Sequence, residues 1–321
     1  MDEQYDVVVI GGGAAGLSGA VALARSRRRV LVIDAGEPRN APAGHVHNYL
    51  AREGTPPAEL LAAGRGEVTG YGGTVVDGRV TAARGTVGDF EVDLADGRSV
   101  RARRLLMTTG LVDELPDVPG VAQRWGRDVL HCPFCHGWEA RDRAIGILAT
   151  GPLALHQALM WRQISADVTV FRHTGPGFGD DELEQLAARG IRVVDGEVVA
   201  LEVKGDRLTG VRLASGEVVA RDAVVVTPRF TARSELLAAL GLETAEQVVN
   251  EIVVGTYVPA DPTGATAVPG VWVAGNVTAL MAQVIASAAA GLMAGAAING
   301  DLVAEDTRLA VAAARELAGV A

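Results

Sequence analysis

The fold of this chain is decided by the stretch Tyr5-Asp6-Val7-Val8-Val9-Ile10-Gly11-Gly12-Gly13-Ala14-Ala15-Gly16. It begins as a β-branched, apolar strand, turns through three glycines and continues into a helix of small residues that reaches about Arg25. A second apolar strand, Val30–Ile33, follows and ends on Asp34. Strand, glycine turn, helix, second strand and terminal acid together are typical of a dinucleotide-binding βαβ unit.

Each glycine of this unit has a physical task. Gly11 permits the tight turn after the strand, Gly13 lets the backbone approach a pyrophosphate, and Gly16 lets the helix pack closely on the strand. The start of the helix offers free N–H groups and the positive end of its dipole to phosphates. Asp34 can accept a hydrogen bond from a ribose hydroxyl. The pattern therefore predicts a bound dinucleotide at this end of the chain.

The length of the chain is compatible with two domains, and its net charge argues against nucleic-acid binding. The 321 residues suffice for two domains, and a net charge of −10 argues against a nucleic-acid surface, which would need a basic stripe. The mildly apolar segment 279–299 is interrupted by Gln283, Ser287 and glycines, so we expect a packed core helix and no membrane span. Because no basic-then-apolar leader precedes the first strand, we expect a cytoplasmic protein.

A long irregular stretch, 35–57, follows Asp34 and carries His45, His47 and Asn48. Loops of this length are usually functional, although scattered polar residues on a surface loop would look the same. A helix over 57–67 is expected next. It should be followed by three strands, of which the last two form a hairpin turning at Asp96-Gly97: 74–84, 86–94 and 99–107.

The rest of the chain predicts a second βαβ-like unit and a return to the first. We expect a strand at 144–148, a helix at 152–164, a strand at 167–171, hairpin turns at 204–206 and 215–216, and a helix near 232–240. Residues 266–276 indicate a turn, a buried strand and a Gly-Asn corner before the alanine-rich helix. The predicted fold class is therefore α/β, with two Rossmann-like three-layer domains. The second (114–242) is inserted into the first (1–113 and 243–321).

Both cysteines lie between these units, in His131-Cys132-Pro133-Phe134-Cys135-His136. A C-x-x-C pair in a cytosolic chain indicates redox chemistry or a metal site. Proline suits the first helical position, and a helix beginning near Pro133 would lower a thiolate pKa through its N–H groups and dipole. Tetrahedral zinc would need four ligands from six consecutive residues, which its geometry disfavours. A merely structural C-x-x-C stays open.

Together with both units, four motifs resemble the low-molecular-weight thioredoxin reductase family along essentially the whole chain. They are Gly11-x-Gly13-x-x-Gly16, Thr108-Thr109-Gly110, Cys132-Pro133-Phe134-Cys135, and Thr266-x-Val268-Pro269-Gly270-Val271 running into Ala274-Gly275-Asn276. The resemblance implies the FAD/NAD-linked reductase type of fold, FAD in the first domain and a homodimer. The family's aspartate at the Ala-Gly-Asp corner is Asn276 here. The implied FAD contacts are Gly11, Gly13, Ala15, Gly16, Asp34, Ala35, Asn40, Asn48, Val80, Thr109, Gly110, Gly275, Asn276, Gln283 and Val284.

The chain departs from the family where a nicotinamide cofactor would bind. The second fingerprint should read G-x-G-x-x-A, but the aligned residues are Ala149-Thr150-Gly151-Pro152-Leu153-Ala154. The family's cationic clamp for the 2′-phosphate of NADPH aligns with Arg172-His173-Thr174 and then with Gly179-Asp180-Asp181-Glu182. A side chain at the tight turn, a missing N–H donor and acids in place of cations predict that the inserted domain does not bind NADPH.

A further departure lies beside the cysteines, where family reductases have aspartate and this chain has His136. C-P-F-C-H-G resembles the dithiol-oxidase branch, which includes the enzymes that close the disulfides of gliotoxin and holomycin. The resemblance implies that a small-molecule dithiol supplies electrons through the cysteine pair to FAD. O2 then accepts these electrons and is released as H2O2. Cys135 would be the sulfur next to the flavin, Cys132 the exchanging sulfur, and His136 the acid–base group.

Two other functions stay open at this point. One is a thioredoxin or protein-disulfide reductase fed by NADPH, ferredoxin or a reduced flavoprotein; the other is a non-catalytic flavoprotein redox sensor. We expect no metal, nucleic-acid or membrane partner, and a resting state with the cysteine pair against the flavin. His131 is interpreted as a packed neighbour, while Phe134 and Trp138 could line a substrate pocket or belong to the core.

Overall fold

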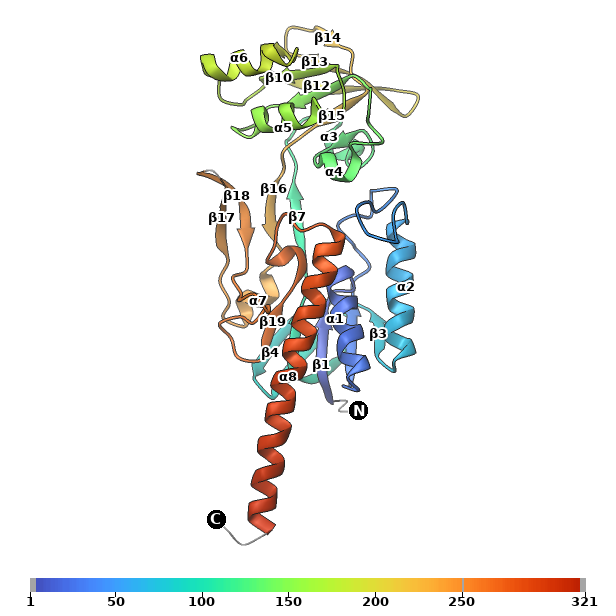
Figure 1. Cartoon of the computed structure of the whole chain (residues 1–321), viewed down its shortest axis with the longest axis vertical. Coiled ribbons are helices and arrows are strands. Elements are labelled where there is room, and N and C mark those ends of the chain that lie inside the picture. The colour runs from blue at the N-terminus through green and yellow to red at the C-terminus, as the bar shows by residue number, and fades with distance from the viewer. Residues whose placement is uncertain (1–3, 250, 318–321) are drawn as a thin grey trace.

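The computed structural model describes residues 4–249 and 251–317, which form two layered units joined by two strands (Figure 1). The first unit contains a seven-stranded sheet in the order β3-β2-β1-β6-β5-β4, with β19 paired to β6. Its strands are β1 (Gln4–Ile10), β2 (Val30–Asp34), β3 (Thr74–Asp77), β4 (Val80–Thr86), β5 (Asp89–Leu94), β6 (Ser99–Met107) and β19 (Val271–Val273).

The central strand β1 is buried on both faces, as its unbroken apolar run requires. Val7 and Val9 point into one core cluster, and Val8 and Ile10 into the cluster on the opposite face. Helices α1 (Ala14–Arg25), α2 (Pro57–Gly70) and α8 (Val284–Leu317) contribute to the first of these clusters. The predicted βαβ unit is confirmed, because β1 and β2 pair in parallel on either side of α1 in the chain.

The inserted unit has a five-stranded parallel sheet in the order β11-β10-β9-β15-β8. Helices α5 (Ala154–Trp161) and α6 (Asp180–Ala188) pack with it, and a three-stranded antiparallel sheet lies alongside. The remaining elements are α3 (Val121–Arg124), β8 (Val129–Leu130), α4 (Pro133–His136), β9 (Ile145–Leu148), β10 (Val168–Phe171), β11 (Arg192–Val194), β12 (Val198–Lys204), β13 (Arg207–Leu213), β14 (Val218–Val219) and β15 (Ala223–Val225).

The two units are joined by an antiparallel pair of strands, β7 (Leu111–Glu114) and β16 (Arg229–Ala232), which we call the ribbon. It continues into a four-stranded sheet of order β17-β18-β16-β7 on the side of the first unit. That region also holds α7 (Glu235–Ala239), β17 (Ala245–Val249), β18 (Ile252–Tyr257) and the short helix η1 (Gly275–Val277).

The predicted fold class is confirmed, but two details differ. The strand expected over 74–84 is two strands, because the chain turns at Gly78-Arg79 and β3 and β4 lie at opposite ends of the sheet order. The segment 232–242, assigned above to the insert, has Ala232, Leu237 and Leu242 in the core of the first unit. The crossover between the units therefore runs along β16.

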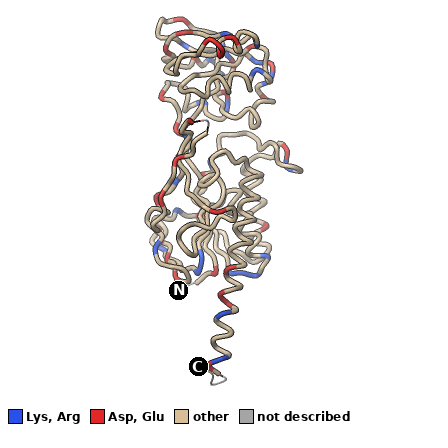
Figure 2. Tube along the Cα trace, turned by 60° about the vertical axis from the view of Figure 1, so that its left-hand side comes forward, with Lys and Arg blue, Asp and Glu red and all other residues tan. Residues whose placement is uncertain are grey.

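Helix α8 is long and apolar enough to span a membrane by length and composition alone. Its first half is a core helix: buried small residues such as Gly291 and Gly295 lie against α1, where an added Cβ would approach the Ala15 or Gly19 carbonyl oxygen within 1.9 and 2.7 Å. Beyond Leu302 no described residue of α8 is buried, and the helix projects from the body (Figure 1). Acidic and basic residues are interspersed over both units (Figure 2).

Candidate active site

A cavity of about 980 Å³ lies at the junction of the two units. Its walls come from the β1–α1 turn, the loop after β2, the end of β6, and the turn from η1 into α8. The inserted unit adds residues of α4 and α5, so the cysteine motif and the predicted dinucleotide site share one space. Of the implied FAD contacts, the cavity is lined by Gly11, Gly13, Ala15, Asp34, Ala35, Asn40, Val80, Thr109, Gly110, Gly275, Asn276, Gln283 and Val284.

The three glycines of the fingerprint fit a dinucleotide. Gly11 has φ +110°, and a Cβ there would lie 2.4 Å from the Thr108 carbonyl oxygen. A Cβ on Gly16 would lie 1.9 Å from the Gly11 carbonyl oxygen, so Gly16 allows helix–strand contact and is itself absent from the cavity wall. A Cβ on Gly13 would meet nothing within 4 Å, so the backbone here is open to an approaching phosphate.

The acid that ends β2 is positioned by two donors. Asp34 accepts from the Gly12 backbone N–H at 3.1 Å and from Arg65 at 2.6 Å. A carboxylate has about four lone-pair sites, so room is left for a ribose hydroxyl. Thr109 donates to the Arg233 carbonyl oxygen at 2.7 Å, which ties this wall to the chain leaving the ribbon.

The two cysteine sulfurs lie 2.7 Å apart at the start of α4, which begins at Pro133 as predicted. The Cys135 thiol donates to Cys132, and this hydrogen bond lowers the pKa of Cys132 to about 7 although burial opposes it. The Phe134 and Cys135 backbone N–H groups lower it further. The same hydrogen bond, together with burial, raises the pKa of Cys135. Cys132 is therefore the thiolate of the reduced pair and the sulfur suited to exchange.

His136 follows directly and also lines the cavity. Both of its ring nitrogens are buried, and neither has a hydrogen-bond partner among the described residues. Burial lowers the pKa of His136, while the charge of Glu139 partly offsets this. A neutral imidazole without a hydrogen-bond partner, in a residue that lines the cavity, is suited to take a proton from an incoming group.

The loop after β2 contacts the cysteine motif. His47 lies 2.5 Å from Glu53 and 3.5 Å from Glu139, so it joins this loop to the segment after α4. Asn48 donates from its side-chain amide to the Phe134 carbonyl oxygen at 2.6 Å and does not line the cavity. An FAD contact from Asn48 stays a prediction, whereas its contact with the cysteine turn was not foreseen.

The aromatic residues of the motif are exposed, so the core interpretation is wrong for both. Phe134 is 61% exposed and lines the cavity, whereas Trp138 is 70% exposed and lies under the Arg141 guanidinium. His131 packs edge-on against Phe230 at 5.4 Å and bonds the Val226 carbonyl oxygen, in keeping with a packed neighbour. No group of three or more metal-binding side chains gathers within the described part of the chain.

Several residues aligned with the family's nicotinamide site make contacts within the inserted unit. Ala149 is buried, and Gly175 lies so close that a Cβ on it would come within 2.9 Å of the Ala149 carbonyl oxygen. His173 accepts a hydrogen bond from the Val198 N–H at 3.1 Å, and Arg172 pairs with Asp195 at 2.8 Å. Ala149, Arg172 and His173 thus contact other residues of the inserted unit, whereas a Cβ on Gly151 would meet nothing within 4 Å.

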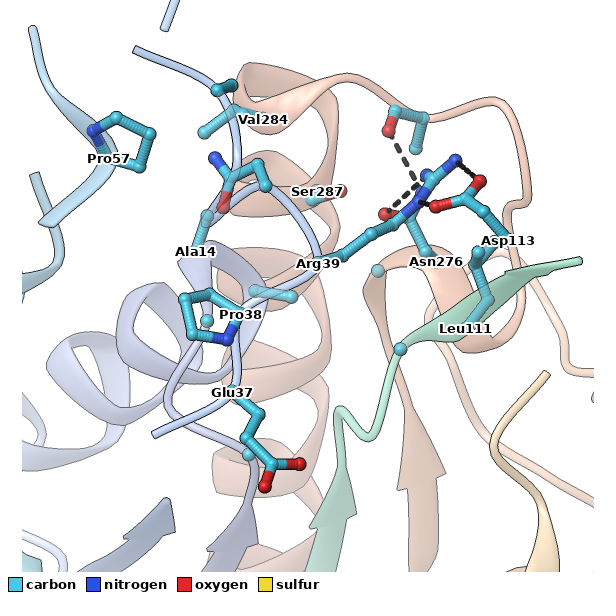
Figure 3. A pocket seen from close by; sticks show the side chains of 18 of the residues that line it. Ala14, Glu37, Pro38, Arg39, Pro57, Leu111, Asp113, Asn276, Val284 and Ser287 are labelled. Carbon is cyan, nitrogen blue, oxygen red and sulfur yellow. Dashed lines mark hydrogen bonds and ion pairs between the residues drawn. The ribbon is translucent and has the colours of Figure 1, made fainter. Parts of the chain in front are cut away.

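Several cavity residues were missed by the sequence reasoning, and Arg39 is one of them. Arg39 points across the cavity wall to Asp113 on β7 and to Asn276, as Figure 3 shows. No local pattern marks it, since Asp113 is 74 residues away in the chain. Its position next to Asn40, in a long loop that follows a nucleotide-binding strand, was the only available signal.

A family model described as "Pyridine nucleotide-disulphide oxidoreductase" matches residues 5–295. The chain is 30% identical to "Thioredoxin reductase tcpT" of Claviceps purpurea, covering 94% of this chain and 95% of that protein. It is also 30% identical to "Thioredoxin reductase sirT" of Leptosphaeria maculans, with the same coverage. The crystal structure of HlmI superimposes with a TM-score of 0.91 at 45% identity over 99% of both chains.

Proposed function

The chain belongs to the pyridine nucleotide-disulphide oxidoreductase family, whose thioredoxin reductase-like members are FAD-binding flavoproteins acting on sulfur, and from that premise we propose that it is an FAD-dependent dithiol oxidase. Its substrate is a small-molecule dithiol, which is closed to a disulfide while O2 is reduced to H2O2. The overall reaction balances as R(SH)2 + O2 → RS2 + H2O2.

One observation carries this proposal: the cysteine pair and the intact first fingerprint line one cavity, whereas the second fingerprint has lost its first glycine at Ala149. Cys132, Cys135 and His136 line the same space as the glycine turn and Asn276. Gly175 packs against Ala149, and His173 accepts a hydrogen bond from the Val198 N–H, which supports a loss of nicotinamide binding in the inserted unit. This arrangement supports the entry of electrons through the cysteines. The broad cavity, open beside the exposed Phe134, supports a small dithiol as their source.

In this mechanism the oxidised Cys132–Cys135 pair is the electrophile. A substrate thiol transfers its proton to His136, and the resulting thiolate attacks the Cys132 sulfur, so that the Cys135 thiolate leaves. His136 passes this proton to Cys135 and then takes the proton of the second substrate thiol. The second thiolate attacks the substrate sulfur of the mixed disulfide, releasing the Cys132 thiolate and the closed disulfide. The pKa of about 7 makes Cys132 a good leaving group near neutral pH. Bound FAD supplies the two-electron oxidation that restores the pair and delivers the electrons to O2.

The test compares two reductants under argon. The holoprotein is mixed with dithiothreitol or with NADPH, and the oxidised flavin absorbance is followed. We expect rapid bleaching by the dithiol and negligible bleaching by NADPH. In air, the dithiol should yield one H2O2 per disulfide formed. Fast bleaching by NADPH, or a failure of dithiol to bleach the flavin, would overturn the proposal.

The names of the relatives favour a second candidate, a thioredoxin or protein-disulfide reductase. It would run the cysteine pair in the opposite direction and take electrons from NADPH or another donor such as ferredoxin. Reduction of a protein disulfide by the pre-reduced holoprotein, faster than its reoxidation by oxygen, would promote this function over the first.

We further propose a cytoplasmic homodimer. The projecting half of α8 supports a partner chain, because it presents Val303, Leu309 and Val311 to the outside. Light scattering of the purified holoprotein should give twice the mass of 33.2 kDa. A mass of one chain at micromolar concentration would contradict the dimer.

A further inference from the structure

Arg39 contacts the first strand of the ribbon, β7, through Asp113. Its guanidinium makes a two-pronged ion pair with Asp113 on β7, with N–O distances of 2.8 and 2.6 Å. The Asp113 side chain is only 8% exposed. A carboxylate so buried needs its cation, since an unpaired charge at this depth is strongly destabilising. If the ribbon moved away from Arg39, the buried Asp113 carboxylate would therefore lose its cation.

The same guanidinium contacts the second strand. Its carbon lies 5.2 Å from the centre of the Phe230 ring on β16, a cation–π distance. Phe230 and Asp113 are direct cross-strand partners in the β7–β16 register. Arg39 thus contacts both residues of one cross-strand pair, Asp113 by charge and Phe230 through its aromatic face. We call the pair Asp113 and Phe230 the rung.

A third contact fastens this rung to the cofactor corner. Arg39 donates to the Asn276 side-chain oxygen at 3.3 Å (Figure 3). The Asn276 amide nitrogen donates to the Ala279 and Ala282 carbonyl oxygens at 3.0 and 2.9 Å, which leaves the oxygen facing Arg39. The Phe230 ring also packs edge-on against His131, next to Cys132. Contacts therefore run unbroken from the Asn276 corner to the cysteine motif.

We propose that Arg39 is a positioning residue that clamps the Asp113–Phe230 rung to Asn276 and so holds the inserted unit with Cys132 and Cys135 at the cavity. The inference rests on the proposed role of the cysteines as the redox pair, and does not depend on oxygen as the acceptor. Loss of the clamp frees the ribbon to bend and lets the cysteine motif leave the cavity. The guanidinium also adds a small lowering of the pKa of Cys132 to the dominant effect of Cys135.

The experiment measures access to the cysteines in the reduced holoprotein without turnover. The rate of alkylation by a bulky polyethylene-glycol maleimide is measured and divided by the rate of alkylation by iodoacetamide at the same pH. Division by the small-reagent rate removes any change in thiolate content, which would alter both reactions. We expect Arg39→Met to raise this ratio about tenfold, as for residues coupled by direct contact, and Arg39→Lys to restore part of the difference. Small-angle scattering of Arg39→Met should show a larger maximum dimension.

Two further variants keep the result interpretable. Arg212→Met removes an ion pair with Glu202 on the exposed β12–β13 hairpin and should leave the ratio unchanged. Arg39→Met combined with Asp113→Asn removes both charges, so it avoids the stranded carboxylate and still lacks the clamp. Its ratio should be as high as that of Arg39→Met. A wild-type ratio in the folded double variant would overturn the clamp, whereas absence of H2O2 alone would count only against the oxidase.

Discussion

The side-chain amide of Asn48 and the backbone carbonyl of Phe134 are joined by a hydrogen bond of 2.6 Å. Asn48 has φ +57°, a left-handed conformation that asparagine tolerates better than most residues. Its own N–H donates to Glu53 at 2.8 Å, which fixes the residue in the loop. The loop of the first unit therefore contacts the middle of the C-x-x-C turn of the second. In Figure 1 this loop lies next to α4.

Removing the Asn48 amide should loosen the cysteine turn. Asn48→Gly keeps the left-handed backbone accessible and deletes the donor, while Asn48→Asp keeps the shape. Since one hydrogen bond contributes about 0.5–1.5 kcal/mol, we expect kcat/KM for the dithiol to fall about two- to tenfold in both variants. Arg52→Ala, an exposed side chain of the same loop, is the control. Unchanged steady-state kinetics in both Asn48 variants would show that the contact has no role.

The thiol reactivity of Cys132 should depend on Cys135. In the reduced protein, the pH dependence of iodoacetamide alkylation should have its midpoint near 7, the pKa of Cys132. Cys135→Ala removes the donor that lowers this pKa most, and burial still raises it. The midpoint should therefore rise to the ordinary thiol value of about 8.5 or above. A midpoint that stays near 7 would mean that backbone N–H groups, and not the neighbouring thiol, stabilise the thiolate.

His136 should act as a base over an unusually acidic range. Because burial lowers its pKa, His136 is neutral at pH values where an ordinary imidazole is half protonated. The rate of cysteine reduction by dithiol should stay high below pH 6.5 and fall only as His136 becomes protonated. His136→Gln should lose about 10²–10⁴-fold in this rate and also lose the acidic limb of its pH profile. Stopped-flow absorbance measures both, and a persisting acidic limb would assign it to another group.

The inserted unit should depend on one buried ion pair. Arg124 is 5% exposed and bonds Asp128, which is 8% exposed, at 2.8 Å. Arg124→Met would leave the Asp128 charge buried and unpaired, at a cost of about 3–5 kcal/mol in the free energy of unfolding. Arg127 pairs with Asp206 at the surface, so Arg127→Met should cost less than about 1 kcal/mol. Urea denaturation followed by circular dichroism compares the two variants. Equal losses in the free energy of unfolding would contradict the larger contribution of the buried Arg124–Asp128 pair.

Sequence reasoning succeeded where a local pattern carries the geometry. The run from Val7 to Ile10 alternates between two buried faces, and Gly11 and Gly16 stand where a Cβ would collide with backbone. The start of α4 at Pro133 follows equally from a local preference. The single strand predicted over 74–84 was wrong because the turn signal of Asp77-Gly78 was overlooked; β3 ends at Asp77 and β4 begins at Val80.

Contacts between distant residues could not be predicted in this way. Arg39, Asp113 and Phe230 meet because the ribbon passes the loop after β2, and no spacing in the chain encodes that meeting. Asn48 was assigned to the flavin by alignment of a loop, but the direction of its amide depends on where the inserted unit sits. The partner of His173 could not be predicted either, because its Nδ1 accepts a hydrogen bond from the N–H of Val198, which is distant in the chain.

The second fingerprint, where Gly175 packs against Ala149 in place of the first glycine, would have a consequence for the cell. An oxidase of the proposed kind would not compete for reduced nicotinamide with biosynthesis or with antioxidant defence. Its turnover rate would depend on the concentrations of dithiol and O2. The enzyme would therefore stay active during starvation, when reduced nicotinamide is scarce. Each turnover would, however, release a peroxide that other enzymes must remove, so a host would benefit from making this protein together with a catalase or peroxidase.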